Sequence, residues 1–172
     1  MSGSRSKAKG NSWERQVADN LTEIYGEKFI RAPGSGAYVG GKNSHRKELL
    51  HEGQIRNFKG DIVPGQSFPK FNAECKSYKD FPFHQLFSGH VKILDAWIDQ
   101  CMDVADPDDF NILMMKFNRK GTYVVIELND KTKHLQLVRW INYGSVKHGH
   151  WAIMDYDTFW ELNSQSVKDL CR

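Results

Sequence analysis

The sequence has no long apolar run, and this absence excludes several classes of protein. No stretch of its 172 residues approaches the roughly 20 consecutive apolar residues that a membrane-spanning helix requires. The first residues also lack the apolar segment of a secretory signal. We therefore expect a protein that does not enter a membrane and that remains inside the cell.

Cysteine is scarce, which limits the covalent and metal chemistry that the chain can carry. Cys75, Cys101 and Cys171 lie far apart and form no C-x-x-C pair. This spacing excludes a disulfide framework and a zinc site, and it is typical of reduced thiols in a cytosolic protein. Internal repeats are also absent, and the length suits one domain with a real core.

Net charge is small but unevenly distributed. The formal net charge is +3, with 11 Lys or Arg against 6 Asp or Glu in residues 1–60 and 13 against 15 in residues 61–172. A positive part of a chain is a plausible binding surface for a polyanion. Residues 1–10 contribute to it without apolar periodicity, so we expect a disordered basic arm there and a single domain over residues 11–172.

The most informative stretch runs from Gly60 to Lys76 and contains two carboxylates and a lysine. Asp61 precedes a short apolar run, and a turn rich in Gly, Ser and Pro separates it from a strand-like run that ends Glu74-Cys75-Lys76. In a strand, Glu74 and Lys76 project from one face while Cys75 points into the core. If the two runs pair as a hairpin, Asp61 lies close to Glu74.

Such a pair of carboxylates has a direct chemical interpretation. Neighbouring carboxylates repel each other unless a cation lies between them. Oxygen ligands with open water positions suit Mg²⁺ or Mn²⁺, and a lysine beside the ion can orient a water or stabilise charge on a phosphate. The alternative is a surface hairpin with a solvated ion pair.

Apolar residues recur at helical spacing in residues 12–25, which predicts the first helix. Glu14 lies at the edge of its buried stripe, and two interpretations are open. In the first, Asn11 is the N-cap and Glu14 reaches back to its backbone N–H. In the second, Glu14 is a third acidic group that points at a metal site.

A Gly-rich turn and a long polar segment follow a short strand predicted at residues 28–32. The turn Pro33-Gly34-Ser35-Gly36 either lets backbone amides approach a phosphate or is an ordinary turn. Residues 37–59 are basic, and their length between two strands is typical of a functional loop or a solvated insertion. We expect this loop to lie over nucleic acid and to contribute four basic contacts: Lys42, Arg46, Lys47 and Arg56.

The second half of the chain alternates between helix and strand patterns. An amphipathic helix is predicted over residues 83–104. Strands are predicted at 111–117 and 122–128, followed by weaker apolar runs at 135–141 and 151–154. A last helix begins near Thr158, where Thr158 and Glu161 match a capping box.

The order of motifs in residues 10–130 resembles that of the archaeal-type Holliday junction resolvases, which belong to the PD-(D/E)xK nuclease superfamily. The matching pieces are Gly-Asn-Ser-Trp-Glu-Arg, Phe-Ile-Arg-Ala-Pro-Gly-Ser-Gly, Gly-Asp-Ile-Val and Asn-Ala-Glu-Cys-Lys-Ser. Three features depart from the family: Gly60 replaces the signature proline, the loop 37–59 is longer, and residues 130–172 have no counterpart. The resemblance implies an α/β fold of the restriction-endonuclease-like kind, with a mixed central sheet flanked by helices.

The resemblance also implies a catalytic site made of Glu14, Ser35, Asp61, Glu74 and Lys76. In this site Asp61 and Glu74 hold Mg²⁺, for which Mn²⁺ can substitute, together with the carbonyl of Cys75. Glu14 completes the site for a second ion, and Lys76 orients the attacking water or stabilises the phosphate. By the same resemblance, Ser35 and Arg31 contact the neighbouring phosphate.

We therefore expect a metal-dependent DNA endonuclease whose products carry 5′-phosphate. The resemblance favours four-way junctions as substrate, in DNA recombination and repair, and a symmetric homodimer, because two opposed strands need two sites. The alternatives are a restriction-like or nicking endonuclease on duplex DNA, and a DNA-binding module of the same fold without catalysis. The mixture of features fits a phage protein in the cytoplasm of a bacterial host, or a protein of an archaeal cell.

Overall fold

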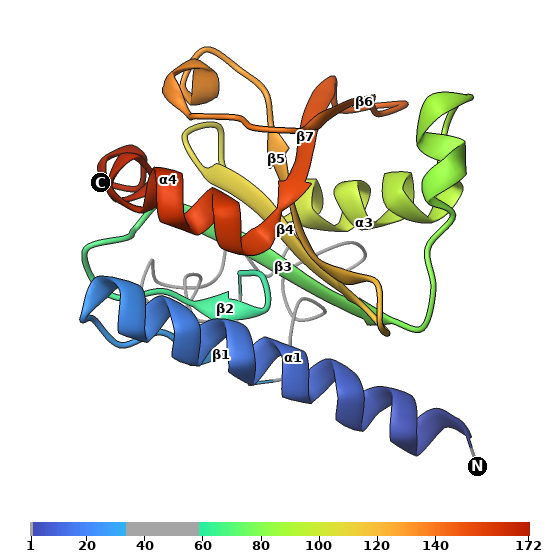
Figure 1. Ribbon diagram of the computed structural model, residues 1–172. Helices are drawn as coiled ribbons and strands as arrows, with labels where there is room; N and C mark the ends of the chain where they lie inside the picture. The colour runs from blue at the N-terminus through green and yellow to red at the C-terminus, as the bar shows by residue number, and fades with distance from the viewer. Residues whose placement is uncertain (1, 34–58) are drawn as a thin grey trace.

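The computed structural model describes residues 2–33 and 59–172, and side chains from residue 8 onward within the first of these segments. Figure 1 shows a mixed sheet with helices on both of its faces, which confirms the predicted α/β fold with a mixed central sheet flanked by helices. The elements in chain order are α1 (Ser2–Tyr25), β1 (Ile30–Arg31), β2 (Ile62–Val63), β3 (Phe71–Tyr78), η2 (Phe83–Phe87), α3 (Lys92–Asp103), β4 (Phe110–Phe117), β5 (Gly121–Glu127), η3 (Thr132–His134), β6 (Ile141–Gly144), β7 (His150–Asp155) and α4 (Tyr156–Leu170).

The main sheet has five strands in the order β3-β4-β5-β7-β6. Strands β3 and β4 are parallel and the other neighbours are antiparallel. A parallel pair needs a crossover connection, and the segment that contains α3 provides it. In this strand order β3 lies at one edge of the sheet. The separate ladder in which β1 and β2 pair antiparallel lies beside it.

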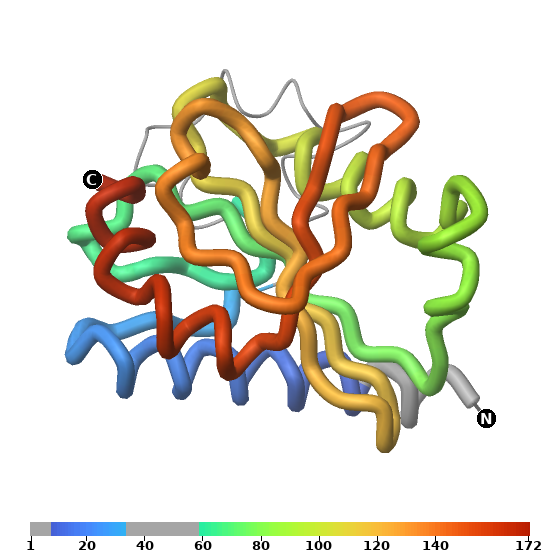
Figure 2. The backbone as a smooth tube through the Cα atoms, turned by 45° about the horizontal axis from the view of Figure 1, so that its top comes forward, coloured from blue at the N-terminus to red at the C-terminus, as the bar shows by residue number. Residues whose placement is uncertain are grey.

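Two apolar cores lie on opposite faces of the sheet, and Figure 2 shows the helices on either side of it. Alternate residues of β4 enter the two cores: Ile112 and Met114 pack with α1 and α4, while Leu113 and Met115 pack with α3. This period of two is expected for a strand covered on both faces. The same alternation places Cys75 of β3 in the core on the α1 side.

The first helix is longer than the sequence indicates. Helix α1 begins at Ser2, so residues 2–10 are helical, and this corrects the predicted disordered arm. The physical reason is that a helix already anchored by its apolar stripe extends at little cost through Lys, Arg and Ala, which are good helix formers. Asn11 consequently lies inside the helix, and the predicted capping box of Asn11 and Glu14 is wrong.

Other boundaries also differ from the sequence pattern. The predicted helix 83–104 is divided into η2 and α3, with Gly89 at φ +153° between them. The hairpin expected between the Asp61 run and β3 does not form as a ladder, because β2 pairs with β1. The cap of α4 is Asp155, whose side chain accepts from the Thr158 amide over 2.9 Å. In the apolar run 135–141, residues 135–140 are not a strand, and Ile141 is the first residue of β6.

Candidate active site

Asp61 lies along the free edge of β3 and is bound to that strand at two points. Its backbone amide donates to the Ala73 carbonyl over 2.8 Å, and its carboxylate Oδ2 accepts from the Cys75 amide over 2.8 Å. Asp61 is 4 % exposed. These bonds bring Asp61 beside Glu74, as the sequence predicts, although the strands do not pair as a hairpin.

Gly60 makes this approach possible, and it explains the missing signature proline. Its φ is +69°, and a Cβ at this position would lie 2.5 Å from the Ala73 carbonyl oxygen. Proline requires φ near −65°, so neither proline nor any other side chain fits this backbone. The glycine is therefore required by the local conformation.

Glu74 is the most deeply buried acid of the site. Its side chain is 0 % exposed, and burial, followed by the nearby Asp61 carboxylate, raises its pKa well above the ordinary range. Oxygen Oε2 accepts from the Gln100 side chain over 2.9 Å and lies 3.4 Å from the Lys76 ammonium. Oxygen Oε1 has no hydrogen-bond partner among the described residues. An unsatisfied buried carboxylate oxygen is costly unless a ligand completes it.

Gln100 of α3 is the site residue that the sequence analysis missed. Its side-chain oxygen accepts from the Lys76 ammonium over 2.7 Å while its amide donates to Glu74. Gln100 thus connects Lys76 and Glu74, which project from the same face of β3 as predicted. The sequence carries only a weak signal for it: Gln100 stands three residues after buried Trp97, at the margin of the apolar stripe.

Glu14 and Arg31 form a pair beside these residues. The Nε group of Arg31 donates to Glu14 Oε2, and its Nη2 donates to Asn11 Oδ1 over 2.8 Å. Burial and, next, the negative charge of Asp61 raise the pKa of Glu14, while Arg31 opposes the shift. Asp61 is therefore close enough to Glu14 to raise its pKa, but the hydrogen-bond partner of Glu14 is Arg31. Its place in a metal site, and a phosphate contact by Arg31, stay predictions.

The donor set fits a divalent cation at Asp61 and Glu74. The observation that supports the fit is the unpartnered Oε1 of Glu74 next to a second carboxylate. No cluster of three or more His, Cys, Asp or Glu side chains gathers within residues 2–33 and 59–172. The Cys75 thiol is not a third ligand, because burial raises its pKa well above the usual range. Ligation by the Cys75 carbonyl stays a prediction.

Several predicted DNA contacts lie outside the described residues: Ser35, Lys42, Arg46, Lys47 and Arg56. Lys59, at the end of the predicted basic loop, is described, and it is not available to a phosphate. Its ammonium pairs with Asp106 over 2.9 Å and with Asp109, and its side chain is 7 % exposed. It fixes the chain before Asp61 to the segment before β4.

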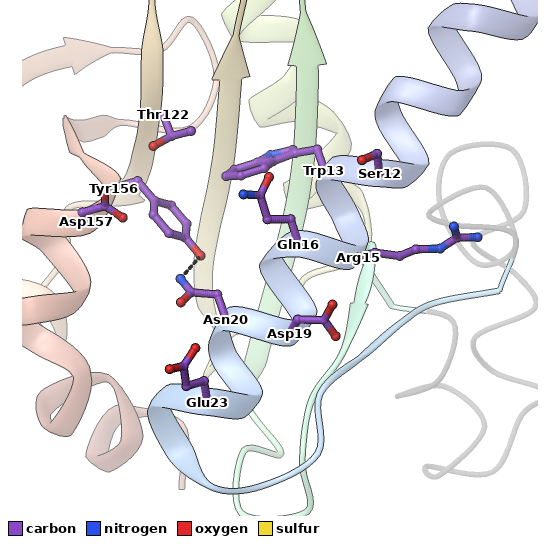
Figure 3. Close-up of a pocket in the computed structure, with 10 residues that line it drawn as sticks. All are labelled: Ser12, Trp13, Arg15, Gln16, Asp19, Asn20, Glu23, Thr122, Tyr156 and Asp157. Carbon is purple, nitrogen blue, oxygen red and sulfur yellow. Dashed lines mark hydrogen bonds between the residues drawn. The ribbon is translucent and has the colours of Figure 1, made fainter.

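A separate cavity of about 770 Å³ lies between α1, β5 and the start of α4. Figure 3 shows its lining side chains, with Asn20 donating to the Tyr156 hydroxyl over 2.9 Å. Three of the lining residues are acidic, namely Asp19, Glu23 and Asp157, and one is basic, Arg15. A net negative wall repels a polyanion, and none of the predicted catalytic residues lines this cavity.

Glu74 and Lys76 project from the edge strand β3, and Asp61 lies beside them. This is the arrangement that the resemblance to PD-(D/E)xK nucleases predicts. The model of the family described as "Phage putative PDDEXK endonuclease" matches residues 5–167, and the chain belongs to this family. It is also 37% identical over 100 residues to Protein D14 of Escherichia phage T5. The matched region covers 56% of this chain and 54% of that protein. The chain thus spans about half the length of this relative. No solved structure matches this chain. In the described part of the chain, no helix has the length and apolarity to cross a bilayer.

Proposed function

We propose that this member of the endonuclease family hydrolyses phosphodiester bonds in branched DNA, with four-way junctions as its preferred substrate, and that it requires a divalent cation. The observation that carries the metal requirement is Oε1 of Glu74, which has no hydrogen-bond partner among the described residues. Burial and, next, the neighbouring Asp61 carboxylate raise the pKa of Glu74. A cation is the simplest group that satisfies both carboxylates.

Asp61 and Glu74 are the residues that would hold Mg²⁺ or Mn²⁺, with the Cys75 carbonyl and Glu14 as further candidates. Such an ion supplies Lewis-acid activation of water and of a phosphate oxygen. The protein contributes the positions of the two carboxylates. Asp61 is fixed by the Cys75 amide, and Glu74 is fixed by Gln100, so neither side chain needs to reorganise when substrate arrives.

Lys76 acts on the phosphate in this proposal. Its ammonium is bound by Gln100 over 2.7 Å and lies 3.4 Å from Glu74. A lysine bound in this way stabilises negative charge that develops on the phosphate oxygens, or orients the attacking water. Arg31 and Ser35 would contact the neighbouring phosphate, and the loop residues Lys42, Arg46, Lys47 and Arg56 would add sequence-independent contacts.

The preference for four-way junctions rests on the resemblance of the motif order to junction resolvases. Cutting two opposed strands of a junction requires two sites and therefore a symmetric homodimer. Trp140 is 39% exposed and is a candidate residue for the dimer interface, whereas Trp151 and Trp160 are buried in the cores. The second candidate function, nicking or cutting of duplex DNA, is supported by the family, whose description names an endonuclease without a substrate.

Cleavage assays on matched labelled DNAs test this proposal. A four-way junction, a duplex and a single strand are incubated with Mg²⁺, Mn²⁺, Ca²⁺ or excess EDTA. We expect junction cutting with Mg²⁺ or Mn²⁺, binding without cutting in Ca²⁺, and no cutting in EDTA. Cleavage that persists in the chelator contradicts the metal requirement, and faster cutting of the duplex than of the junction favours the second candidate function.

Two variants serve as a matched pair in the same assay. Asp61→Asn removes one ligand charge and should abolish cleavage while junction binding is retained. Asp99→Asn is the control: Asp99 lies on α3 next to Gln100, but its carboxylate pairs with His148 over 3.0 Å and with Lys147 over 3.5 Å. It should cut like the wild type. Equal loss of activity in both variants would show that a general effect of removing a negative charge, and not metal ligation, is responsible.

A further inference from the structure

A groove of about 470 Å³ lies between the N-terminal part of α1 and the end of β3, and Lys76 is one of its lining residues. In Figure 1 the N-terminal part of α1 and the turn between β4 and β5 lie at the same end of the molecule, where this groove is found. The groove is lined by Lys9, Gly10, Cys75, Lys76, Ser77, Tyr78, Lys79 and Asn118. Lys76 belongs both to the lining of this groove and to the proposed active site, so the groove adjoins the site at this residue.

The lining of this groove is positive. It contains three lysines and no carboxylate. Lys9 and Lys79 are exposed, and neither forms a salt bridge with a residue that the structure describes. The nearest acidic residue in the sequence, Asp80, pairs with Lys120. Two lysines without a salt bridge in the described part of the chain, beside Lys76 of the proposed nuclease site, make a groove that is complementary to a nucleic-acid backbone.

Tyr78 is the aromatic residue among those that line the groove. It is 44% exposed, and its ring packs against buried Trp97 with 4.9 Å between the ring centroids. The Tyr78 carbonyl accepts from the Asn118 amide over 3.2 Å, which fixes the end of β3 to the β4–β5 turn. Tyr78 is therefore a supported ring with an accessible surface, and such rings stack on nucleobases.

We propose that this groove binds an unpaired segment of the DNA strand that enters the active site, with Lys9 and Lys79 on its phosphates and Tyr78 stacked on a base. The inference rests on the proposed function and specifies its substrate. A base in a regular duplex is covered by its neighbours on both faces, so only an unpaired or frayed base can stack on a tyrosine. The groove thus selects DNA that carries a single-stranded segment next to the cleavage point.

Binding measurements without divalent metal test the inference independently of cleavage. Fluorescence anisotropy compares a labelled single strand with a duplex of the same sequence for wild type, Tyr78→Ala and Tyr78→Phe. We expect Tyr78→Ala to weaken single-strand binding about tenfold and duplex binding by less than about threefold, while Tyr78→Phe stays within about twofold of wild type. Melting curves confirm that each variant is folded.

The double variant Lys9→Gln, Lys79→Gln tests the phosphate contacts. The slope of log K against log salt for the single strand should fall by about 0.7 for each phosphate that a lysine no longer neutralises. The control Lys133→Gln, Lys168→Gln has the same charge change, on η3 and on α4, and it should retain the wild-type slope. An unchanged slope in the groove variant, or an equal fall in the control, would overturn the inference.

The outcomes separate this inference from the proposed function. If no DNA is cut with any metal but Tyr78→Ala and the lysine variant lose single-strand affinity, the proposed function fails and the groove assignment stands. If the protein cuts DNA and these variants bind single strands like the wild type, the groove assignment fails and the nuclease assignment stands.

Discussion

The side chain of Gln100 donates to Oε2 of Glu74 over 2.9 Å, and Oε1 of the same carboxylate remains without a partner among the described residues. One oxygen of Glu74 is thus held by the protein and the other is left for a ligand. Gln100 also accepts from Lys76 over 2.7 Å, so one amide positions the acid and the cation together.

Gln100→Leu should therefore reduce kcat about tenfold or more while KM changes little, because Gln100 orients Lys76 and Glu74 and does not itself contact the substrate. Single-turnover and steady-state cleavage measurements show whether kcat falls while KM stays nearly constant. Gln100→Glu places a third negative charge beside Glu74 and should raise the Mg²⁺ concentration needed for half-maximal activity or abolish cutting. A change confined to KM in Gln100→Leu would assign Gln100 to substrate binding instead.

Glu14 and Arg31 provide a second test, because the structure removes the capping role of Glu14. Glu14→Gln should lower cleavage strongly with the melting temperature almost unchanged if the carboxylate serves a metal. Arg31→Gln is the matched change on the other partner of the same pair, and it should weaken DNA binding more than the cleavage of bound DNA. If Glu14→Gln cuts like the wild type, Glu14 is removed from the site and its role is to pair with Arg31.

Gly60 supports the position of Asp61. The loss of stability when Gly60 is replaced can be compared with the loss at Gly26, a second glycine in the same backbone conformation. Gly60 and Gly26 have φ of +69° and +64°, but a Cβ on Gly26 meets nothing within 4 Å, whereas on Gly60 it lies 2.5 Å from the Ala73 carbonyl oxygen. Gly26→Ala should lower the free energy of unfolding by about 1–2 kcal/mol, because alanine is strained in the left-handed conformation. Gly60→Ala should lower it by the same amount and by about 1–3 kcal/mol more, because of the clash with the Ala73 carbonyl.

Urea denaturation of both variants gives the comparison. Gly60→Ala should also lose cleavage, because relief of the clash must move Asp61 away from β3. Equal free-energy losses in the two variants would show that the chain relaxes at Gly60 without effect on the fold.

Much of the site followed from the sequence because it depends on short-range geometry. The alternation of β3 places Glu74 and Lys76 on one face, and the motif order places Asp61 near them. The contribution of Gln100 could not be predicted, since it depends on how α3 crosses the sheet, which is a tertiary relationship. The start of α1 was missed because residues 2–10 carry no apolar period, and the pairing of β2 with β1 depends on long-range contacts that two-residue strands do not encode.

Glu74→Gln gives a last prediction, about stability, that does not depend on catalysis. The folded-state pKa of Glu74 is raised above its ordinary value of 4.5 by burial and by Asp61. Its contribution to stability is therefore fully present below pH 4.5 and is lost as the pH rises through the folded pKa. The neutral amide avoids this loss. In EDTA, Glu74→Gln should melt above the wild type at neutral pH, by a few degrees because about 1 kcal/mol corresponds to about 2–4 °C in a domain of this size.

The difference in melting temperature should close as the pH falls toward the ordinary carboxyl range. Glu27→Gln is a control of opposite sign: Glu27 accepts from the Ser67 amide over 2.8 Å, which lowers its pKa, so that variant should melt below the wild type at neutral pH and converge with it in acid. Added Mg²⁺ should stabilise the wild type more than Glu74→Gln, because a ligand that binds the folded state raises its stability. A wild type that gains stability over Glu74→Gln as the pH rises in EDTA would contradict a buried Glu74 carboxylate whose charge the protein compensates only in part, and with it the cation site that this charge implies.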